Sequence, residues 1–359
     1  MKLGIITQPL HSNYGGVLQN FALQRVLSSL GHTPVTIDQK KKVSFFKYIL
    51  SVCKSLIYIL LGKKRVICGY KSLVKRPFIF DNFVCKQIKT TAPTGKISRK
   101  FVGKYKFDGF VVGSDQVWRP RYNEHNLYDM FLAFCSNMPV RRVAYAASFG
   151  VDNWEYNDAQ TAVCAKYAQS FDAISVREDS AVSLCEDYLK VPAVKVLDPT
   201  LLLDKSKYED ISYAVPRQES PFLFAYILDL TPEKRAFVKS LETQLNIKSH
   251  IHSADTMASL SIEQWVAMFR DASYVVTDSF HGTCFSIIFE KDFYSIGNKR
   301  RGATRFNSLL ECFNLQARYV DFPLTEPVSV QDRIDWNAVR NVLEIKKSES
   351  VNFLEKNLK

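Results

Sequence analysis

The stretch Tyr274–Thr283 reads Y-V-V-T-D-S-F-H-G-T and decides the fold class. An apolar, β-branched run stops at Asp278-Ser279, and a second apolar run, Cys284–Phe289, follows the turn. This order predicts a buried strand that passes through a tight turn into a helix. In an open parallel α/β sheet, such a loop lies at the carboxyl edge of the strands, where ligands bind. We therefore expect an α/β protein with a ligand site in this loop.

His281 in this turn is the first candidate for a catalytic residue. Imidazole gains or loses a proton close to neutral pH, so a histidine at a ligand-binding edge can transfer protons. A histidine that only hydrogen-bonds its own loop fits the same spacing. Gly282 would let the backbone approach a ligand, and Thr283 would cap the following helix.

The start of the chain has the pattern of a first β-α-β unit. Leu3–Thr7 and Thr33–Asp38 are short strand-like runs on either side of a helical apolar face, Val17–Leu30. This alternation is typical of a doubly wound parallel sheet. Gly15 and Gly16 at the expected helix start would expose backbone N–H groups, which favour an anion.

The length of the chain and a second alternation indicate two domains. A chain of 359 residues exceeds the roughly 250–300 residues at which single cores stop growing. Strand and helix patterns restart at Phe222 after a polar segment with two prolines. We expect a first domain over residues 1–205, a hinge over 206–221, a second domain over 222–325 and C-terminal helices over 326–359.

Two further strand ends carry polar residues. Phe107–Val112 is followed by Gly113–Trp118, G-S-D-Q-V-W, which repeats the opening pattern of a Val-Val strand end, polar residues and an aromatic. We expect the two loops at equivalent positions of two related domains, facing a shared cleft. Arg177 likewise follows a strand, Ala173–Val176; a surface ion pair with a neighbouring acidic residue is the alternative explanation for it.

Residues 40–106 form a basic, partly apolar insertion. The formal net charge of the chain is +12, which implies an anionic partner. Val43–Leu61 is about long enough to span a bilayer, but Lys47 and Lys54 lie seven positions apart on one helical face. This favours a helix lying on the inner membrane surface through residues 40–76, rather than nucleic-acid binding. A helix packed on the protein core or at a dimer interface is the alternative.

The cysteines and the N-terminus predict a cytoplasmic protein. Eight cysteines are scattered without a C-x-x-C pair, so we expect reduced, structural thiols. The short run after Met1-Lys2 is too short for the apolar core of a secretory signal. With six dispersed histidines, we expect no metal site.

Six blocks, in order, resemble the polysaccharide pyruvyl transferase family. They are I-I-T-(x)5-N-Y-G-G-V-L-Q-(x)2-A-L-Q (Ile5–Gln24), F-D-G-F-V-V-G-S-D-Q-V-W (Phe107–Trp118), A-Y-A-A-S-F-G (Ala144–Gly150), I-S-V-R-E (Ile174–Glu178), V-L-D-P-T-L-L-L (Val196–Leu203) and D-S-F-H-G (Asp278–Gly282). The resemblance implies two Rossmann-like domains that face each other across a cleft, as in GT-B glycosyltransferases. It also implies transfer of a pyruvyl group from phosphoenolpyruvate onto two hydroxyls of one sugar, in an exopolysaccharide, a capsule or a lipid-linked oligosaccharide precursor. That reaction uses phosphoenolpyruvate as co-substrate and needs no cofactor.

The resemblance places the donor on the second domain, at the histidine block, with an arginine from the R-E block. These positions are His281, as the catalytic residue, and Arg177. Some relatives carry a basic residue where this chain has Ser279, so part of the phosphate contact must come from elsewhere. The expected donor-binding residues are Arg177, Ser279, Phe280, Gly282, Lys299, Arg300, Arg301 and Arg305.

Acceptor contacts are expected from loops of the first domain. Polar side chains and an aromatic face suit a sugar, and the candidates are Asn13, Tyr14, Gly15, Ser114, Gln116 and Trp118. Asp115 is the candidate for a second catalytic group, or alternatively an N-cap of a following helix. Trp118 as a core anchor is the alternative to a sugar contact.

Two other functions fit the same architecture. A glycosyltransferase that uses a nucleotide sugar would need an acidic residue on the ribose, for which Glu290 is the one candidate in the second domain. A non-catalytic glycan- or anion-binding protein would not need His281 and Arg177.

Overall fold

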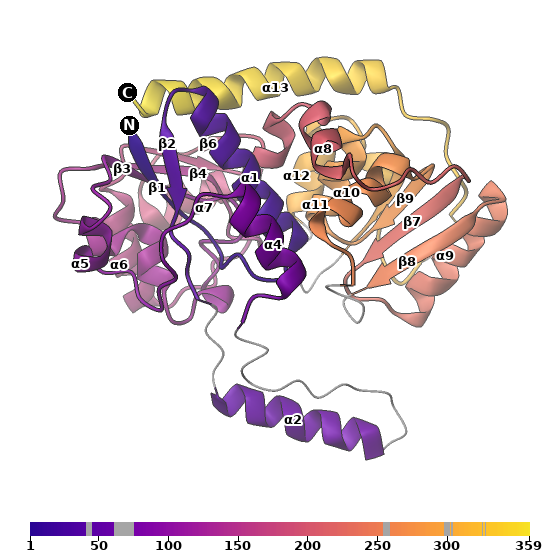
Figure 1. Ribbon diagram of the computed structural model, residues 1–359, viewed down its shortest axis with the longest axis horizontal. Helices are drawn as coiled ribbons and strands as arrows, with labels where there is room; N and C mark the ends of the chain where they lie inside the picture. The colour runs from indigo at the N-terminus through magenta and orange to yellow at the C-terminus, as the bar shows by residue number, and fades with distance from the viewer. Residues whose placement is uncertain are drawn as a thin grey trace.

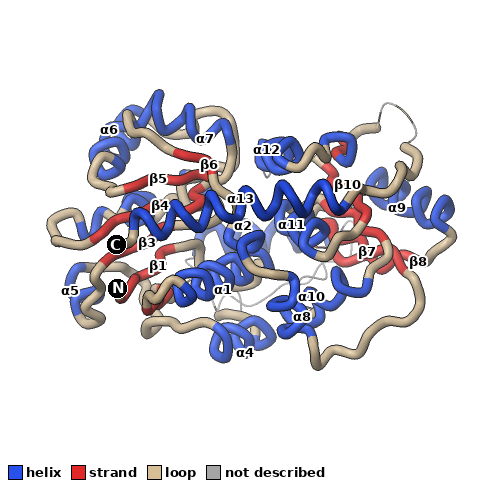
Figure 2. The backbone as a smooth tube through the Cα atoms, turned by 90° about the horizontal axis from the view of Figure 1, so that it is seen from above, coloured by secondary structure: helices blue, strands red, loops and turns tan. Residues whose placement is uncertain are grey.

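The computed structural model of the chain describes residues 1–40, 45–60, 75–253, 259–297, 302, 304–324, 326 and 328–359. Two parallel β-sheets lie side by side, and helices cover both faces of each sheet (Figures 1 and 2). The expected fold class, two Rossmann-like α/β domains facing each other across a cleft, is confirmed.

The first sheet has six strands in the order β2-β1-β3-β4-β5-β6. Every neighbouring pair is parallel. The strands are β1 (Lys2–Ile6), β2 (Thr33–Thr36), β3 (Gly109–Val112), β4 (Arg141–Ala147), β5 (Ala173–Val176) and β6 (Val194–Lys195).

The second sheet has five strands in the order β11-β10-β9-β7-β8, again all parallel. They are β7 (Phe222–Ile227), β8 (Lys248–Ser253), β9 (Tyr274–Thr277), β10 (Asp292–Ile296) and β11 (Tyr319–Val320). Read from β8, this order matches the first sheet read from β2. Strands β3 and β9 therefore occupy equivalent positions, which confirms the prediction made from their similar loops. All residues of both strands are buried, as in parallel sheets covered on two faces.

The helices follow the strands in the expected alternation. Those of the first domain are α1 (Tyr14–Ser29), α4 (Phe78–Gln87), α5 (Arg99–Gly103), α6 (Asp158–Ala168) and α7 (Asp179–Leu184). Those of the second are α9 (Pro232–Leu245), α10 (Ile262–Asp271), α11 (Phe280–Ile288) and α12 (Thr304–Cys312). Short turns of helix include η1 (Pro120–Tyr122), η2 (Leu127–Phe131), η3 (Ala133–Cys135), η4 (Cys185–Leu189), η5 (Pro199–Leu202) and η7 (Gln316–Arg318).

Two segments differ from their expected form. The expected hinge over residues 206–221 contains α8 (Lys205–Ser212), which packs on the second domain through Tyr208 and Phe285. Among the described elements of the insertion over residues 40–106, α2 (Phe45–Leu60) alone lies apart from both domains (Figure 1). Helix α4 instead buries Phe80, Phe83 and Val84 in the core, because its apolar residues meet α1.

The last helix, α13 (Trp336–Asn357), runs across both domains (Figures 1 and 2). Near its C-terminal end, Ser350 Oγ accepts a hydrogen bond from Leu197 N of the first domain at 3.0 Å. Near its N-terminal end, Arg340 forms an ion pair with Glu290 of the second domain at 2.9 Å. The helix thus ties the two domains together on one side.

One apolar core continues from the first domain into the second. At the interface the ring of Tyr14, from α1, stacks on Trp265, from α10, with centroids 5.3 Å apart. Its hydroxyl donates to the carbonyl of Leu260 at 2.7 Å. Because both rings are fully buried, this contact fixes α1 against the second domain.

We expect Tyr14→Ala to lower the free energy of unfolding by about 3–5 kcal/mol, because it leaves a cavity between the domains. Urea titration followed by circular dichroism measures this. Tyr128→Ala is the control, since Tyr128 is 40% exposed, and it should change stability little. Equal effects of the two substitutions would contradict the packing role of Tyr14.

Candidate active site

A cleft of about 540 Å³ lies between the two domains. It forms where the strand order reverses in each sheet, at the loops after β1 and β3 on one side and after β7 and β9 on the other. Its first-domain wall includes Gln8, His11, Asn13, Asp115, Gln116 and Tyr122, and its second-domain wall includes Ser279, Phe280, His281 and Arg305.

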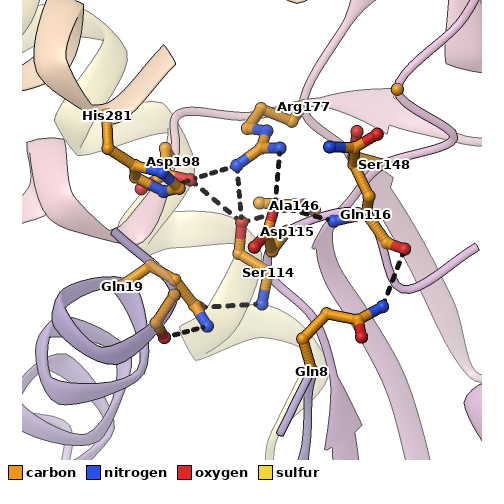
Figure 3. Close-up of polar contacts among 12 residues, drawn as sticks. Gln8, Gln19, Ser114, Asp115, Gln116, Ala146, Ser148, Arg177, Asp198 and His281 are labelled. Carbon is orange, nitrogen blue, oxygen red and sulfur yellow. Dashed lines mark hydrogen bonds and ion pairs between the residues drawn. The ribbon is translucent and has the colours of Figure 1, made fainter. Parts of the chain in front are cut away.

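Asp198, just after β6, is the centre of a buried polar cluster beside the cleft (Figure 3). Its Oδ1 accepts from the backbone N–H of Thr200 at 3.0 Å and from the Thr200 hydroxyl at 2.7 Å. Its Oδ2 accepts from Arg177 Nη1 at 2.7 Å and from Ser114 Oγ at 3.0 Å. The same oxygen lies 3.7 Å from Nε2 of His281, so one carboxylate joins both domains.

The surroundings of this carboxylate keep it ionised. Burial alone would raise the pKa of Asp198, but the neighbouring His281 and Arg177 side chains and the Thr200 N–H hold it well below its usual value. For Arg177, burial would lower the pKa, while the carboxylates of Asp198 and Asp115 raise it. Both groups are therefore charged at neutral pH, and their ion pair holds the cluster in one geometry.

His281 is fixed between the two domains in the first turn of α11. Ser279 caps this helix, because its Oγ accepts from the backbone N–H of Gly282 at 3.3 Å. The imidazole packs directly on Gly15 of α1, where an added Cβ would lie 2.0 Å from Nδ1. His281 thus has Nε2 beside Asp198 and Nδ1 against Gly15, and it lines the cleft.

Two guanidinium groups lie over the ring of Phe280, beside His281. The Cζ atom of Arg177 is 4.3 Å from the ring centroid and that of Arg305 is 5.5 Å from it. Burial, together with the neighbouring charge of Arg177, lowers the pKa of Arg305 to about 10, so it remains protonated at neutral pH. Arg305 lines the cleft, whereas Arg177 does not. The cleft wall therefore presents a buried cation that can bind an anion.

Glu178 holds a loop of the first domain in place. Its Oε1 accepts from Ser148 Oγ and from the backbone N–H groups of Phe149 and Gly150, at 2.8–3.0 Å. The backbone of Gly302, from the second domain, lies so close to Gly150 that an added Cβ would be 1.6 Å from its carbonyl oxygen. By holding this loop, Glu178 therefore also fixes a contact between the two domains.

Asp278 holds a loop of the second domain in place. Its carboxylate accepts from the backbone N–H groups of Leu228 and Asp229, at 2.5 and 3.1 Å. It also accepts from Lys234 Nζ at 2.6 Å, an ion pair that is almost fully buried. These bonds fix the loop after β7, which forms part of the cleft wall.

The model of the polysaccharide pyruvyl transferase family matches residues 13–300. The chain belongs to this family. It is therefore a transferase of polysaccharide biosynthesis. Among solved structures, the chain is similar to the UDP-GlcNAc 2-epimerase of Methanocaldococcus jannaschii, at 12% identity and a TM-score of 0.47, covering 97% of this chain and 93% of that one. It is also similar to the UDP-GlcNAc 2-epimerase of Neisseria meningitidis bound to UDP-GlcNAc, at 9% identity and a TM-score of 0.47, covering 96% and 99%. A search of curated proteins finds no match.

Several residues expected on the donor side of this pyruvyl transferase line the cleft: His281, Ser279, Phe280 and Arg305. Lys299, Arg300 and Arg301 lie outside the described residues. Gly282 does not line the cleft; an added Cβ there would lie 2.2 Å from Thr277 Oγ1, so the glycine lets α11 pack against β9. Thr283 does not cap α11, since Ser279 does.

On the acceptor side, Asn13, Asp115 and Gln116 line the cleft. Tyr14 and Trp118 were expected to contact a sugar, and both are fully buried. Trp118 is a core anchor, because its ring stacks on Phe131 at 4.9 Å and its Nε1 donates to the carbonyl of Met130.

Two further residues expected on the acceptor side do not line the cleft. Ser114 and Gly15 are buried and support Asp198 and His281 rather than a ligand. Asp115 caps no helix; it adopts φ +70°, and its Oδ1 accepts from the N–H of Gln116 at 2.9 Å.

The sequence interpretation assigned no role to Asp198, Glu178 or Asp278. The signal for Asp198 was present, since Asp198-Pro199 ends a strand at the carboxyl edge just as Arg177 does. In the part of the chain that the structure describes, no group of three or more His, Cys, Asp or Glu side chains could hold a metal ion.

We expect Asp198→Asn to lower the free energy of unfolding by about 3 kcal/mol at pH 7, because Arg177 loses its buried partner. The folded-state pKa of Asp198 is depressed, so its stabilising effect is present above the unfolded pKa of about 3.9 and is lost as the pH falls below it. Urea midpoints measured between pH 7 and pH 3 should therefore move closer together for the wild type and the variant, because part of this stabilising effect is lost by pH 3. Asp172→Asn, at a surface ion pair with Arg141, is the control; an identical profile for both variants would contradict this role of Asp198.

Proposed function

We propose that the cleft transfers the carboxyethylidene group of phosphoenolpyruvate onto two hydroxyls of one sugar, forming a pyruvate ketal. The observation that carries this proposal is the position of His281, which lies on the cleft wall beside the buried cation of Arg305 and is oriented by Asp198. The cleft therefore combines a proton-transfer group and an anion site within one small space.

The donor would bind on the second-domain wall. Phosphoenolpyruvate carries a phosphate and a carboxylate, and both need cations or N–H donors. Arg305 and the N-terminal turn of α11, which begins at Phe280, supply these on adjacent elements. In some relatives a basic residue stands at the position of Ser279. This arrangement supports Arg305 as the residue that makes the corresponding phosphate contact in this chain. Arg177 would position Phe280 from behind.

The reaction requires two additions at one carbon. A proton is added to the methylene carbon of phosphoenolpyruvate, and one sugar hydroxyl attacks the adjacent carbon and loses its proton. The C–O bond to phosphate then breaks, inorganic phosphate leaves, and the second hydroxyl attacks the same carbon and releases its own proton to close the ketal. Per turnover, one proton enters the new methyl group and one leaves with the phosphate. His281 is our candidate for moving these protons, because imidazole can give and take them near neutral pH.

The acceptor sugar would lie on the first-domain wall, near Asn13, Gln116 and Tyr122. Asp115 faces the same space. Burial would raise its pKa, but the charges of Arg177, His281 and Arg305 lower it overall, so the carboxylate can accept a hydrogen bond from an attacking hydroxyl. The chemistry needs neither a metal nor a nicotinamide, and phosphoenolpyruvate is the co-substrate.

The alternative, a glycosyltransferase that uses a nucleotide sugar, has less support. Glu290, the candidate for reading a ribose, forms an ion pair with Arg340 on α13 and does not line the cleft. A purely binding function would leave the orientation of His281 by Asp198 without a purpose.

The proposed location is the cytoplasm, at the inner face of the membrane. The cysteines that the structure describes are free thiols, and Cys135, Cys164, Cys185 and Cys284 are buried, in keeping with a reducing compartment. None of the described helices is long and apolar enough to cross a bilayer.

His281→Ala should reduce turnover at least roughly 100-fold, the low end of what general acid–base catalysis contributes, with an unchanged circular dichroism spectrum. Phosphate release from phosphoenolpyruvate in the presence of candidate glycans measures this. His32→Ala, at a histidine that contacts the N-terminal amine and does not line the cleft, is the control. Near-wild-type turnover of His281→Ala would remove His281 from the mechanism.

Arg305→Ala should weaken phosphoenolpyruvate binding by roughly 10–100-fold, because a charge-assisted hydrogen bond to the donor is lost. Thermal shift over a phosphoenolpyruvate titration measures this, since stabilisation follows occupancy of the folded state. Arg305→Lys should recover part of the loss, and Arg25→Ala, on the exposed side of α1, should behave as wild type. Stabilisation by UDP but not by phosphoenolpyruvate would instead favour the glycosyltransferase.

A further inference from the structure

Helix α2 exposes more apolar surface than a helix in water normally does. Among its described side chains, Ile49, Leu50, Leu56, Ile57 and Ile59 are 42–57% exposed. The helix lies apart from both domains, so neither sheet covers it (Figure 1). An uncovered apolar surface of this kind marks an interaction site.

The polar residues of α2 form one narrow stripe. Among the described side chains, Lys54 and Ser55 lie four and three positions before Tyr58 and so share one helical face with it, while apolar residues occupy the rest. The helix contains no acidic residue. A broad apolar face with lysines at its polar side is the pattern of a helix that lies in a membrane interface.

The first connection to α2 leaves the body at the cleft. Lys40 lines the cleft, and its backbone N–H donates to the carbonyl of Thr94 at 2.8 Å. Phe45, the first residue of α2, follows Lys40 by five positions. A chain of that length spans at most roughly 18 Å, so α2 begins close to the cleft wall whatever path the connection takes.

The return connection is anchored at the same place. Arg76 Nε donates to the carbonyl of Leu10 at 2.5 Å, and its Nη2 forms an ion pair with Asp38 at 2.6 Å. Leu10 lies between two residues that line the cleft, Pro9 and His11. Both ends of the α2 segment therefore meet the body beside the opening of the cleft.

An exposed aromatic side chain lies on the return connection. Phe78, at the start of α4, is 82% exposed, two positions after Arg76 and three after the exposed Lys75. The N-terminal end of α4 points toward α2 in Figure 1. An exposed aromatic ring close to basic residues is typical of membrane-interface anchors.

We infer that α2 and Phe78 bind an anionic membrane surface and hold the opening of the cleft toward the bilayer. The acceptor sugar would then enter the cleft from a lipid anchor in that surface, a consequence that rests on the proposed function. Charge favours this occupant over a second copy of the chain, since each copy carries a formal charge of +12 and two such basic segments would repel each other.

Cosedimentation with vesicles tests the membrane binding. The experiment needs no phosphoenolpyruvate, so a negative result would count against membrane binding and not against the proposed reaction. The wild type should sediment with vesicles of phosphatidylcholine and phosphatidylglycerol, and much less with phosphatidylcholine alone. Ile57→Asp should weaken sedimentation at least roughly 10-fold, because an isoleucine side chain no longer enters the interface. The matched control is Ile345→Asp, at 60% exposure on α13 against 57% for Ile57, and it should bind as wild type. Absent binding of the wild type, equal binding of the two variants, or self-association in light scattering that Ile57→Asp abolishes would each overturn the inference.

The orientation has its own test. In Phe78→Trp, brominated lipids in the anionic vesicles should quench the added tryptophan fluorescence. Tyr213→Trp, at a position 88% exposed beyond the end of α8, should not be quenched. Equal quenching of the two, or quenching of the second alone, would overturn the orientation.

Discussion

The buried carboxylate of Asp198 is the constraint on which the site depends. A carboxylate away from water is costly unless cations and hydrogen-bond donors surround it. Here it takes bonds from Thr200, Ser114 and Arg177, all in the first domain, and its remaining side meets His281 of the second. Because these partners come from four separate strand ends, satisfying one charge fixes the relative positions of the loops that form the cleft.

The domain interface imposes a second constraint of the same kind. Gly15 gives the imidazole of His281 room, and Gly302 gives room to the loop at Gly150, so the domains approach at two points where a side chain would clash. The stack of Tyr14 on Trp265 then continues the apolar core across the interface. The polysaccharide pyruvyl transferase therefore brings two domain edges together at one cleft, which the imidazole of His281 and the guanidinium of Arg305 both line.

The sequence was most informative where a residue type and a strand end coincide. His281 and Asp115 were predicted in this way, and both face the cleft. It was misleading for the aromatics: Trp118 and Tyr14 suit a sugar by type, yet each fills a core position that only packing reveals. Arg177 was expected at the ligand, but its charge is already matched by Asp198. No local sequence pattern shows with which of two buried partners a charged side chain will form its ion pair.

The sequence by itself determined the two α/β domains, because the period of apolar residues sets strands and helices and their alternation sets parallel sheets. It also determined that polar residues follow β3 and β9, at the edge where ligands bind. Only the tertiary structure decided which of these residues meet. Asp198 and His281 are far apart in the chain and lie 3.7 Å apart in space, because two separate domains pack edge to edge. Such a contact depends on how whole surfaces fit together, which no stretch of sequence encodes alone.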